Sequence, residues 1–236
     1  MKNSTLSIVL LSGLAMLAFS SPASAQTDSP VPYQEGLHYA EIEGAPVMET
    51  GDKVVVTEAF SYLCTHCNSI EPYVNSWKKR QPEYVEFERI PVVFGRSSWE
   101  LYARGYITAE MMNVPEEAHS ALMDLLWKDK QILRSMDELA DFYSGFGLDK
   151  EKFLSTSRSF AVDGKLRKDQ SRVQSWGIRG TPAFVLNGKY RISANSAVPS
   201  FEVMFDVVDY LVGIEAANLA QAAGDSPGAD SAAESP

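Results

Sequence analysis

One stretch of the chain restricts the fold more than any other: an apolar strand pattern that leads directly into two closely spaced cysteines. The run Val54–Phe60 is β-branched and apolar, which is typical of a strand buried on both faces of a sheet. Cys64 and Cys67 follow at the start of a helical pattern that ends near Trp77, and residues 85–94 form a second strand pattern. The order strand, helix, strand within about 40 residues predicts a βαβ unit.

The rest of the chain returns to strand patterns only near its end. Between residues 97 and 172 the apolar residues follow helical spacing, so we expect a bundle of several short helices. Residues 183–192 predict a β-hairpin around Asn187-Gly188, the favoured two-residue turn. Residues 197–212 then carry an apolar stripe at helical spacing, and residues 38–42 fit a short edge strand.

The start of the chain predicts a segment that is removed from the mature protein. Lys2 supplies a positive charge, residues 6–19 are apolar, and the A-x-A motif at residues 23–25 fits a cleavage site before Gln26. The alternative is a transmembrane anchor, for which this apolar run is short. We therefore expect residues 1–25 to be the signal peptide of an exported protein, in a compartment that permits disulfides.

Both ends of the expected mature chain are polar. Residues 26–36 contain two prolines and predict a flexible lead-in. From residue 216 onward the chain consists mainly of alanine, glycine, serine, proline and acidic residues, with no lysine or arginine after Arg191. We expect residues 216–236 to form a disordered acidic tail.

The composition excludes several classes of function. Twenty-one lysines and arginines against 31 acidic residues give a net charge of −10, without a basic cluster. Such a chain is not expected to bind nucleic acid or anionic membrane surfaces. Two cysteines and three histidines allow a four-ligand zinc site by number only, because two of the histidines lie far away in unrelated contexts, so we expect no metal.

The motif Cys64-Thr65-His66-Cys67 carries the most specific chemical signal. Cysteines three apart at a helix start lie on one face and can form a disulfide, and the helix N-terminus stabilises a Cys64 thiolate. Thr65 and His66 lie between the sulfurs and can donate hydrogen bonds, while Cys67 should be the more shielded thiol. We favour a redox-active pair. A structural disulfide, half of a zinc site and two buried free thiols are the alternatives.

A second mark, the tripeptide Gly-Thr-Pro at residues 180–182, stands just before the predicted hairpin. Its proline cannot donate a hydrogen bond to a sheet, so it suits a turn or a strand start, with a cis bond as an option. A C-x-x-C pair on the strand-to-helix turn of a βαβ unit is the thioredoxin-like signature. We predict an α/β thioredoxin-like fold, a central mixed sheet flanked by helices, from residues 37–96 and 173–215. Residues 97–172 would form an inserted α-helical domain.

Residues 60–67, the helical insertion and Thr181-Pro182 together resemble the DsbA family of periplasmic thiol:disulfide oxidoreductases. The resemblance covers roughly residues 33–214. It implies a Cys64–Cys67 disulfide in which Cys64 is the nucleophile and Cys67 is the resolving cysteine.

By the same resemblance, His66 stabilises the thiolate and Pro182 is a cis-proline that faces the cysteines. Thr181 would pair its backbone with an extended substrate segment. The chain departs from well-studied members, which carry proline in place of Thr65 and valine in place of Thr181. Both positions tune the redox properties, so the resemblance does not imply a particular reduction potential.

Glu58 is a further candidate, because it lies inside the most apolar strand pattern, six residues before Cys64. A buried carboxylate there could accept or relay the proton of Cys67, and the family uses an acidic residue in this way. Arg89, on the next strand, would lie near the position of the family's basic partner. The alternative is a glutamate at a strand end that reaches water.

The resemblance implies a periplasmic enzyme that oxidises thiol pairs in newly exported proteins. A membrane quinone-linked partner of the DsbB kind would reoxidise it, no metal or organic cofactor is implied, and we expect a monomer. An isomerase or reductase of the same fold is the nearest alternative, although the stretch before Cys64 is short for the dimerisation domain of such isomerases. A peptide-binding chaperone module with an incidental disulfide is an alternative of another class.

Overall fold

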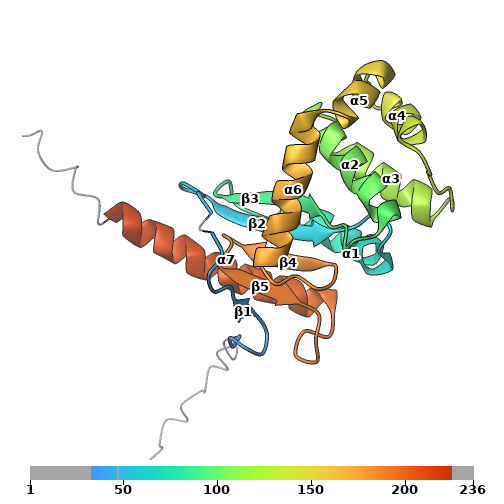
Figure 1. The fold of residues 1–236 in the computed structure, drawn as a ribbon. Coiled ribbons are helices and arrows are strands. Elements are labelled where there is room, and N and C mark those ends of the chain that lie inside the picture. Colours follow the sequence, from blue (N-terminus) through green and yellow to red (C-terminus); the bar gives the residue numbers. More distant parts are fainter. Residues whose placement is uncertain (1–32, 47, 225–236) are drawn as a thin grey trace, which may run out of the picture. The chain divides into compact units, whose positions relative to one another are not determined.

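The computed structural model describes residues 33–46 and 48–224, and within them the chain forms five strands and seven helices (Figure 1). The strands are β1 (Ala40–Glu41), β2 (Val54–Phe60), β3 (Val85–Pro91), β4 (Ala183–Leu186) and β5 (Tyr190–Ser193). The helices are α1 (Thr65–Lys78), α2 (Ser97–Met111), α3 (Glu117–Trp127), α4 (Met136–Ser144), α5 (Lys150–Ser157), α6 (Phe160–Ser175) and α7 (Phe201–Gly224). The predicted signal peptide and most of the predicted lead-in lie outside the described residues.

The five strands form one mixed sheet in the order β1-β5-β4-β2-β3. β2 and β3 run parallel and are connected by α1, as the βαβ pattern predicts. β4 pairs antiparallel with β2 and returns through a two-residue turn into β5. In that turn Asn187 and Gly188 have φ values of 48° and 69°, the left-handed conformation that an Asn-Gly pair adopts at little cost. The predicted hairpin and the thioredoxin-like sheet are confirmed.

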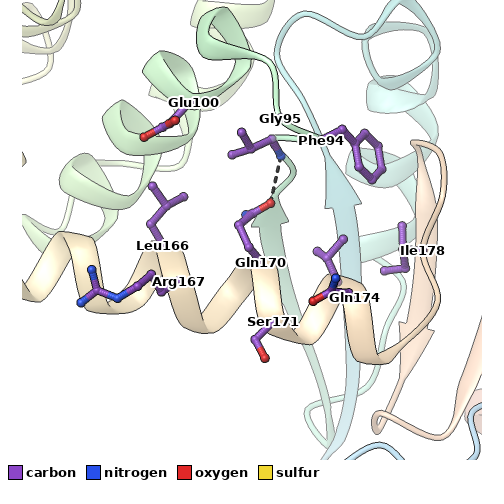
Figure 2. Close-up of a pocket in the computed structure, with 11 residues that line it drawn as sticks. Phe94, Gly95, Glu100, Leu166, Arg167, Gln170, Ser171, Gln174 and Ile178 are labelled. Atoms are coloured by element: carbon purple, nitrogen blue, oxygen red, sulfur yellow. Dashed lines mark hydrogen bonds between the residues drawn. The ribbon is translucent and has the colours of Figure 1, made fainter.

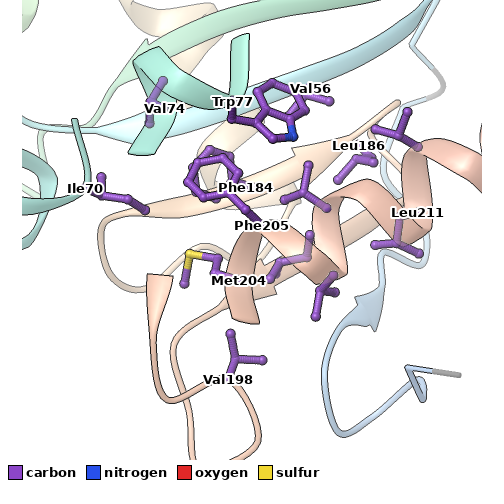
Figure 3. Packing of buried hydrophobic residues seen from close by; sticks show 14 of the residues in the cluster. Val56, Ile70, Val74, Trp77, Phe184, Leu186, Val198, Met204, Phe205 and Leu211 are labelled. Atoms are coloured by element: carbon purple, nitrogen blue, oxygen red, sulfur yellow. The ribbon is translucent and has the colours of Figure 1, made fainter. Parts of the chain in front are cut away.

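Side chains alternate along β2, and this alternation separates two apolar layers. Val54 and Val56 pack with Trp77 of α1 and with the apolar side of α7 (Figure 3). Ala59 belongs to a cluster on the opposite face, together with Trp176 at the end of α6. Helices therefore cover both faces of the sheet, which explains why all seven residues of β2 are buried and five of them are apolar.

The five helices α2–α6 lie between β3 and β4 in the chain. The apolar stripes of α2–α5 meet in a cluster that contains the fully buried side chains of Leu122, Leu139 and Phe153. Phe60 and Cys67 belong to the same cluster. The helices therefore pack against the end of β2 and the first turn of α1, the part of the βα unit that carries the cysteines.

The side chain of Gln170 joins α6 to the end of β3 (Figure 2). Its amide nitrogen donates to the Pro91 carbonyl over 2.9 Å, and its oxygen accepts from the Val93 N–H over 3.1 Å. Beside this contact lies a groove of about 570 Å³, whose lining includes Phe94 and Leu166. None of the site residues predicted from the sequence lines this groove.

The prediction of a disordered tail from residue 216 is wrong for its first part. α7 continues to Gly224, so residues 216–224 are helical, and residues 225–236 lie outside the described part of the chain. The buried carboxylate of Glu215 accepts hydrogen bonds from Asn187 over 2.6 Å and from Lys189 over 2.7 Å, which holds the helix to the hairpin. The alanine-rich residues that follow have high helix propensity and no proline among them.

Three boundaries also differ from the sequence patterns. β1 contains only Ala40–Glu41 of the expected residues 38–42, and α7 begins at Phe201 rather than at residue 197. β3 ends at Pro91 rather than at residue 94, and Phe94 itself has a φ of 48°, outside the extended region.

Candidate active site

Cys64 occupies the N-cap of α1, and Cys67 lies in the first turn of that helix. Both are thiols in this structure; Cys64 is partly exposed, whereas Cys67 is fully buried. β2 ends at Phe60, and a turn of four residues carries the chain from the sheet into α1. The outer sulfur therefore lies where the first N–H groups of the helix have no partner within the helix.

The surroundings of Cys64 favour its thiolate. A hydrogen bond from Cys67 has the largest effect, burial opposes it, and hydrogen bonds from the Thr181 side chain and from the N–H groups of Cys67 and His66 add to it. Together these contacts lower the pKa of Cys64 to about 5. As a thiol, Cys64 donates to the Thr181 carbonyl, with 3.4 Å between Sγ and O.

Cys67 has the opposite environment. Burial raises the pKa of its thiol far above the usual range, and the hydrogen bond to Cys64 and the charge of Glu58 raise it further. At neutral pH the outer sulfur is therefore a thiolate and the inner sulfur is a thiol.

The loop before β4 faces this pair. The Thr181–Pro182 peptide bond is cis, as the family resemblance implies. Pro182 is buried and Thr181 is half-buried, with its carbonyl against Cys64. The structure thus brings together residues that are more than 110 positions apart in the chain.

Thr65 and His66 lie beside the sulfurs, but they contribute less directly than expected. His66 lines an apolar pocket with Phe201 and Met204 of α7, and its backbone N–H supports the thiolate. The described hydrogen bond of Thr65 runs from the Ser69 hydroxyl to the Thr65 carbonyl, over 3.0 Å. A thiolate-stabilising role for the two side chains stays a prediction.

Glu58 and Arg89 form a buried ion pair. They stand opposite each other in the parallel register of β2 and β3, with 3.0 Å between Arg89 Nε and Glu58 Oε2. Their exposed fractions are 1% and 4%, so Glu58 does not reach water. Burial raises the pKa of Glu58 to about 7, against the attraction of Arg89 and with the help of the negative charge of Glu71.

The rest of this charge cluster is not among the residues predicted from the sequence. Arg89 also donates to both oxygens of Glu71 over 3.3 Å and to Glu116 over 2.7 Å. Burial alone would raise the pKa of Glu71, but the close contact with His119, the charge of Arg89 and a hydrogen bond from Ser120 lower it to about 2. A signal was present, since Glu71 lies four residues after Cys67 and hence on the same face of α1.

His119 is buried beside Glu71, although the sequence assigned it no role. Its Nδ1 lies 3.0 Å from the Tyr62 hydroxyl, and its Nε2 lies 3.3 Å from Glu71 Oε2, with an alignment too poor for a regular hydrogen bond. Burial, followed by the charge of Arg89, lowers the pKa of His119, so the ring is neutral near pH 7. α3 thereby contacts the residue that stands two positions before Cys64.

Within the described residues, no group of three or more histidine, cysteine or acidic side chains is placed to hold a metal ion. In the same part of the chain, no helix combines the length and apolar character that crossing a membrane requires.

Two sulfurs of such unequal acidity, within hydrogen-bonding reach of each other and beside a cis-proline, are suited to thiol–disulfide exchange. The mixed sheet that carries them is the sheet of the thioredoxin-like class. This combination defines a thioredoxin-like thiol:disulfide oxidoreductase.

Comparison with known proteins identifies the family within that class. The family model of the DSBA-like thioredoxin domain matches residues 55–205, and the chain belongs to this family. It is 37% identical over 201 residues to the thiol:disulfide interchange protein DsbA of Pseudomonas aeruginosa, covering 84% of this chain and 92% of the relative. It is 35% identical over 204 residues to the DsbA of Azotobacter vinelandii, covering 86% and 93%.

Solved structures agree with this assignment. The crystal structure of Pseudomonas aeruginosa DsbA superposes with a TM-score of 0.72 at 34% identity, covering 82% of this chain and 97% of that chain. The DsbA structure from Xylella fastidiosa gives a TM-score of 0.73 at 30% identity, with coverages of 79% and 100%. The inserted helices and the sheet are therefore both part of the shared fold.

Proposed function

We propose that this enzyme is a periplasmic oxidase, which donates its Cys64–Cys67 disulfide to thiol pairs of newly exported proteins. The observation that carries the proposal is the inequality of the two sulfurs, a pKa of about 5 at Cys64 and a strongly raised pKa at Cys67. A stabilised Cys64 thiolate is a good leaving group, so the disulfide that contains it is readily given away.

The exchange proceeds in two displacements. A substrate thiolate attacks Cys64 Sγ, the Cys64–Cys67 bond breaks, and the electron pair goes to Cys67, which takes up a proton. The second substrate thiolate then attacks the substrate sulfur of the mixed disulfide and expels Cys64 as a thiolate. The substrate is oxidised by two electrons, and the enzyme is left with a Cys64 thiolate and a Cys67 thiol.

Glu58 is the proposed source of the proton for Cys67. Its charge acts on Cys67, and its pKa of about 7 allows it to give or take a proton near neutral pH. Arg89 holds the carboxyl in place through the 3.0 Å contact. Its positive charge also limits the rise in the pKa of Glu58, so that the carboxyl can still lose its proton.

Thr181 and Pro182 are the proposed substrate platform. An extended peptide would pair with the backbone of Thr181, which places its cysteine against Cys64. The DsbA of Proteus mirabilis, which matches this fold with a TM-score of 0.62, has been solved as a cysteine-to-serine variant in complex with the non-covalently bound peptide PWATCDS. The apolar pocket of His66, Phe201 and Met204 would take an apolar side chain of substrate or partner.

The remaining parts of the proposal concern organisation and cell biology. Residues 37–96 and 173–215 would be the thioredoxin-like domain, residues 97–172 its helical insertion, and residues 1–25 a cleaved signal peptide. A membrane quinone-linked DsbB-like enzyme would reoxidise the Cys64–Cys67 pair. The protein would act as a monomer, with Thr65 and His66 tuning the thiolate.

The decisive measurement is the reduction potential of the Cys64–Cys67 couple, obtained in glutathione buffers, together with the Cys64 pKa from thiolate absorbance. We expect a potential above about −150 mV and a pKa far below 8.5. A potential near about −270 mV would instead assign the enzyme to the reductases. Replacing both cysteines should abolish oxidation of a reduced model protein; activity that persists would favour the chaperone alternative.

A further inference from the structure

A polar depression of about 610 Å³ lies beside the cis-proline loop. Its lining includes Arg179 in the loop before β4, Arg191 on β5, and Thr181 with Pro182. Ala194 lines both this depression and the apolar pocket of His66. The two hollows therefore meet at one residue, and together they border the loop that faces Cys64.

The position of Arg191 within this depression is fixed by the local backbone. Its guanidinium donates to the Trp176 carbonyl over 2.5 Å. Gly177 has a φ of 63°, and a Cβ atom there would collide with the Arg191 guanidinium. The backbone conformation therefore favours glycine at this position, and the missing side chain leaves room for the Arg191 guanidinium.

Neither arginine is neutralised by a described residue. Within the described residues, Arg89, Arg104 and Arg172 each contact a carboxylate, whereas Arg179 and Arg191 contact none. Arg179 is exposed. This matters in a chain with 31 acidic and 21 basic residues, because most of its surroundings are negative. The depression is therefore a local positive site next to the reactive sulfur.

We propose that Arg179 and Arg191 bind a carboxylate of the substrate, so that the enzyme prefers thiols with an acidic residue directly next to the reacting cysteine. This inference rests on the proposed function, in which the substrate segment pairs with Thr181. Arg179 stands two residues before Thr181, and Thr181 contacts Cys64. A residue next to the substrate cysteine would therefore lie beside the depression.

The chemistry of the site selects a carboxylate. A guanidinium presents parallel N–H groups that match the two oxygens of a carboxylate. One N–H of the Arg191 guanidinium already donates to the backbone, which orients the group. The hollow on the other side of Ala194 is apolar and has Glu202 in its lining. A peptide with its acidic residue at that side would be repelled, so the pair of hollows also sets the direction of the substrate.

The test uses matched dithiol peptides, acetylated and amidated, that carry Asp or Asn next to one cysteine, on either side of it. The second-order rate at which each peptide reduces the oxidised enzyme is followed by tryptophan fluorescence. Dividing by the rate of the same peptide with a neutral small-molecule disulfide removes differences in thiol acidity. The corrected Asp/Asn rate ratio is then compared between wild type, Arg179→Gln and Arg80→Gln.

Arg80→Gln is the matched control, because it removes the same charge from an exposed residue just beyond the far end of α1. That end lies about 20 Å from Cys64 at 1.5 Å per helical residue. We expect the Asp/Asn ratio to fall about threefold to fivefold in Arg179→Gln, the effect of one exposed ion pair, and to stay at the wild-type value in Arg80→Gln. Arg179→Glu should lower it further, and 0.5 M salt should shrink the wild-type preference.

An Asp/Asn ratio that is the same in wild type and Arg179→Gln, for both peptide positions, would overturn the inference. So would an equal fall in Arg80→Gln, since the effect would then reflect net charge. The proposed function fails in a different way, by the absence of disulfide transfer to any of the peptides. Arg179 is exposed, so folding of its variants is not at issue.

Discussion

At the scale of single residues, the least expected group is a carboxyl inside the most apolar strand. Glu58 is tolerated there because Arg89 lies directly opposite in the register and neutralises it. The neutralisation is incomplete, since Glu71 shares the same guanidinium. Because two buried carboxyl groups share one arginine, one of them can exchange a proton near neutral pH. The pKa of about 7 identifies Glu58 as that group.

Replacing Glu58 by glutamine should stabilise the reduced protein at high pH. The pKa of Glu58 rises from 4.5 to about 7 on folding, so the stability it contributes is present below pH 4.5 and lost as the pH rises through 7. In urea unfolding, E58Q should exceed wild type by at most about 3 kcal/mol at pH 8. The difference should vanish near pH 4.5, while Glu86→Gln, an exposed change on β3, follows wild type. A pH-independent difference would contradict this assignment.

At the scale of elements, α1 both stabilises the reactive sulfur and contacts the inserted helices. Its N-terminus stabilises the Cys64 thiolate, and one turn beyond Cys67 the same face carries Glu71. Glu71 accepts a hydrogen bond from Ser120 over 3.1 Å, which connects α1 to α3. The helix that positions the sulfurs is thereby tied to the inserted helices through a buried, charged contact.

Replacing Glu71 by glutamine should lower stability at neutral pH and flatten its dependence on acid. Folding lowers the pKa of Glu71 from 4.5 to about 2, so its contribution is present above pH 4.5 and lost as the pH falls to 2. We expect E71Q to lose about 3 kcal/mol at pH 7, and to approach wild type below pH 3. Glu117→Gln, on the exposed side of α3, is the control. A loss that is equal at pH 7 and pH 2.5 would point to packing instead of charge.

At the scale of the whole molecule, the inserted helices are not only connected to the sheet along the chain but also contact it directly. Gln170 bonds α6 to the backbone after β3, Trp127 donates its indole N–H to the Tyr62 carbonyl over 2.9 Å, and His119 contacts the Tyr62 hydroxyl. Helices from the insertion thus hold the segment that leads into Cys64. We expect the described part of the chain to unfold cooperatively.

Gln170→Ala tests that coupling. It removes two hydrogen bonds between α6 and the backbone around Pro91, and leaves Val93 N–H without its partner. We expect a loss of about 1 to 3 kcal/mol in urea unfolding, within a single transition that tryptophan fluorescence and circular dichroism report alike. Ser171→Ala, exposed on the same helix, should leave the midpoint unchanged. Two separate transitions in wild type would show that the insertion folds on its own.

The sequence predicts the structure best where the signal is local. The β2 run, the Asn-Gly hairpin and the cysteine motif at a helix start each depend on neighbouring residues, and each occurs where it was expected. It failed at the end of α7, where a composition typical of disorder lies in a helix that is anchored by Glu215. That anchor is formed with the hairpin, 28 residues away, and composition does not report such a contact.

The sequence by itself determined the class of protein, because a C-x-x-C pair after a buried strand and a Thr-Pro before a hairpin are patterns of a few residues each. Only the tertiary structure decided the electrostatics. Glu71 and His119 are 48 residues apart, and the arginines of the polar depression come from a loop and from β5. A pKa depends on burial and on charges within a few ångströms, and those distances exist only once the chain has folded.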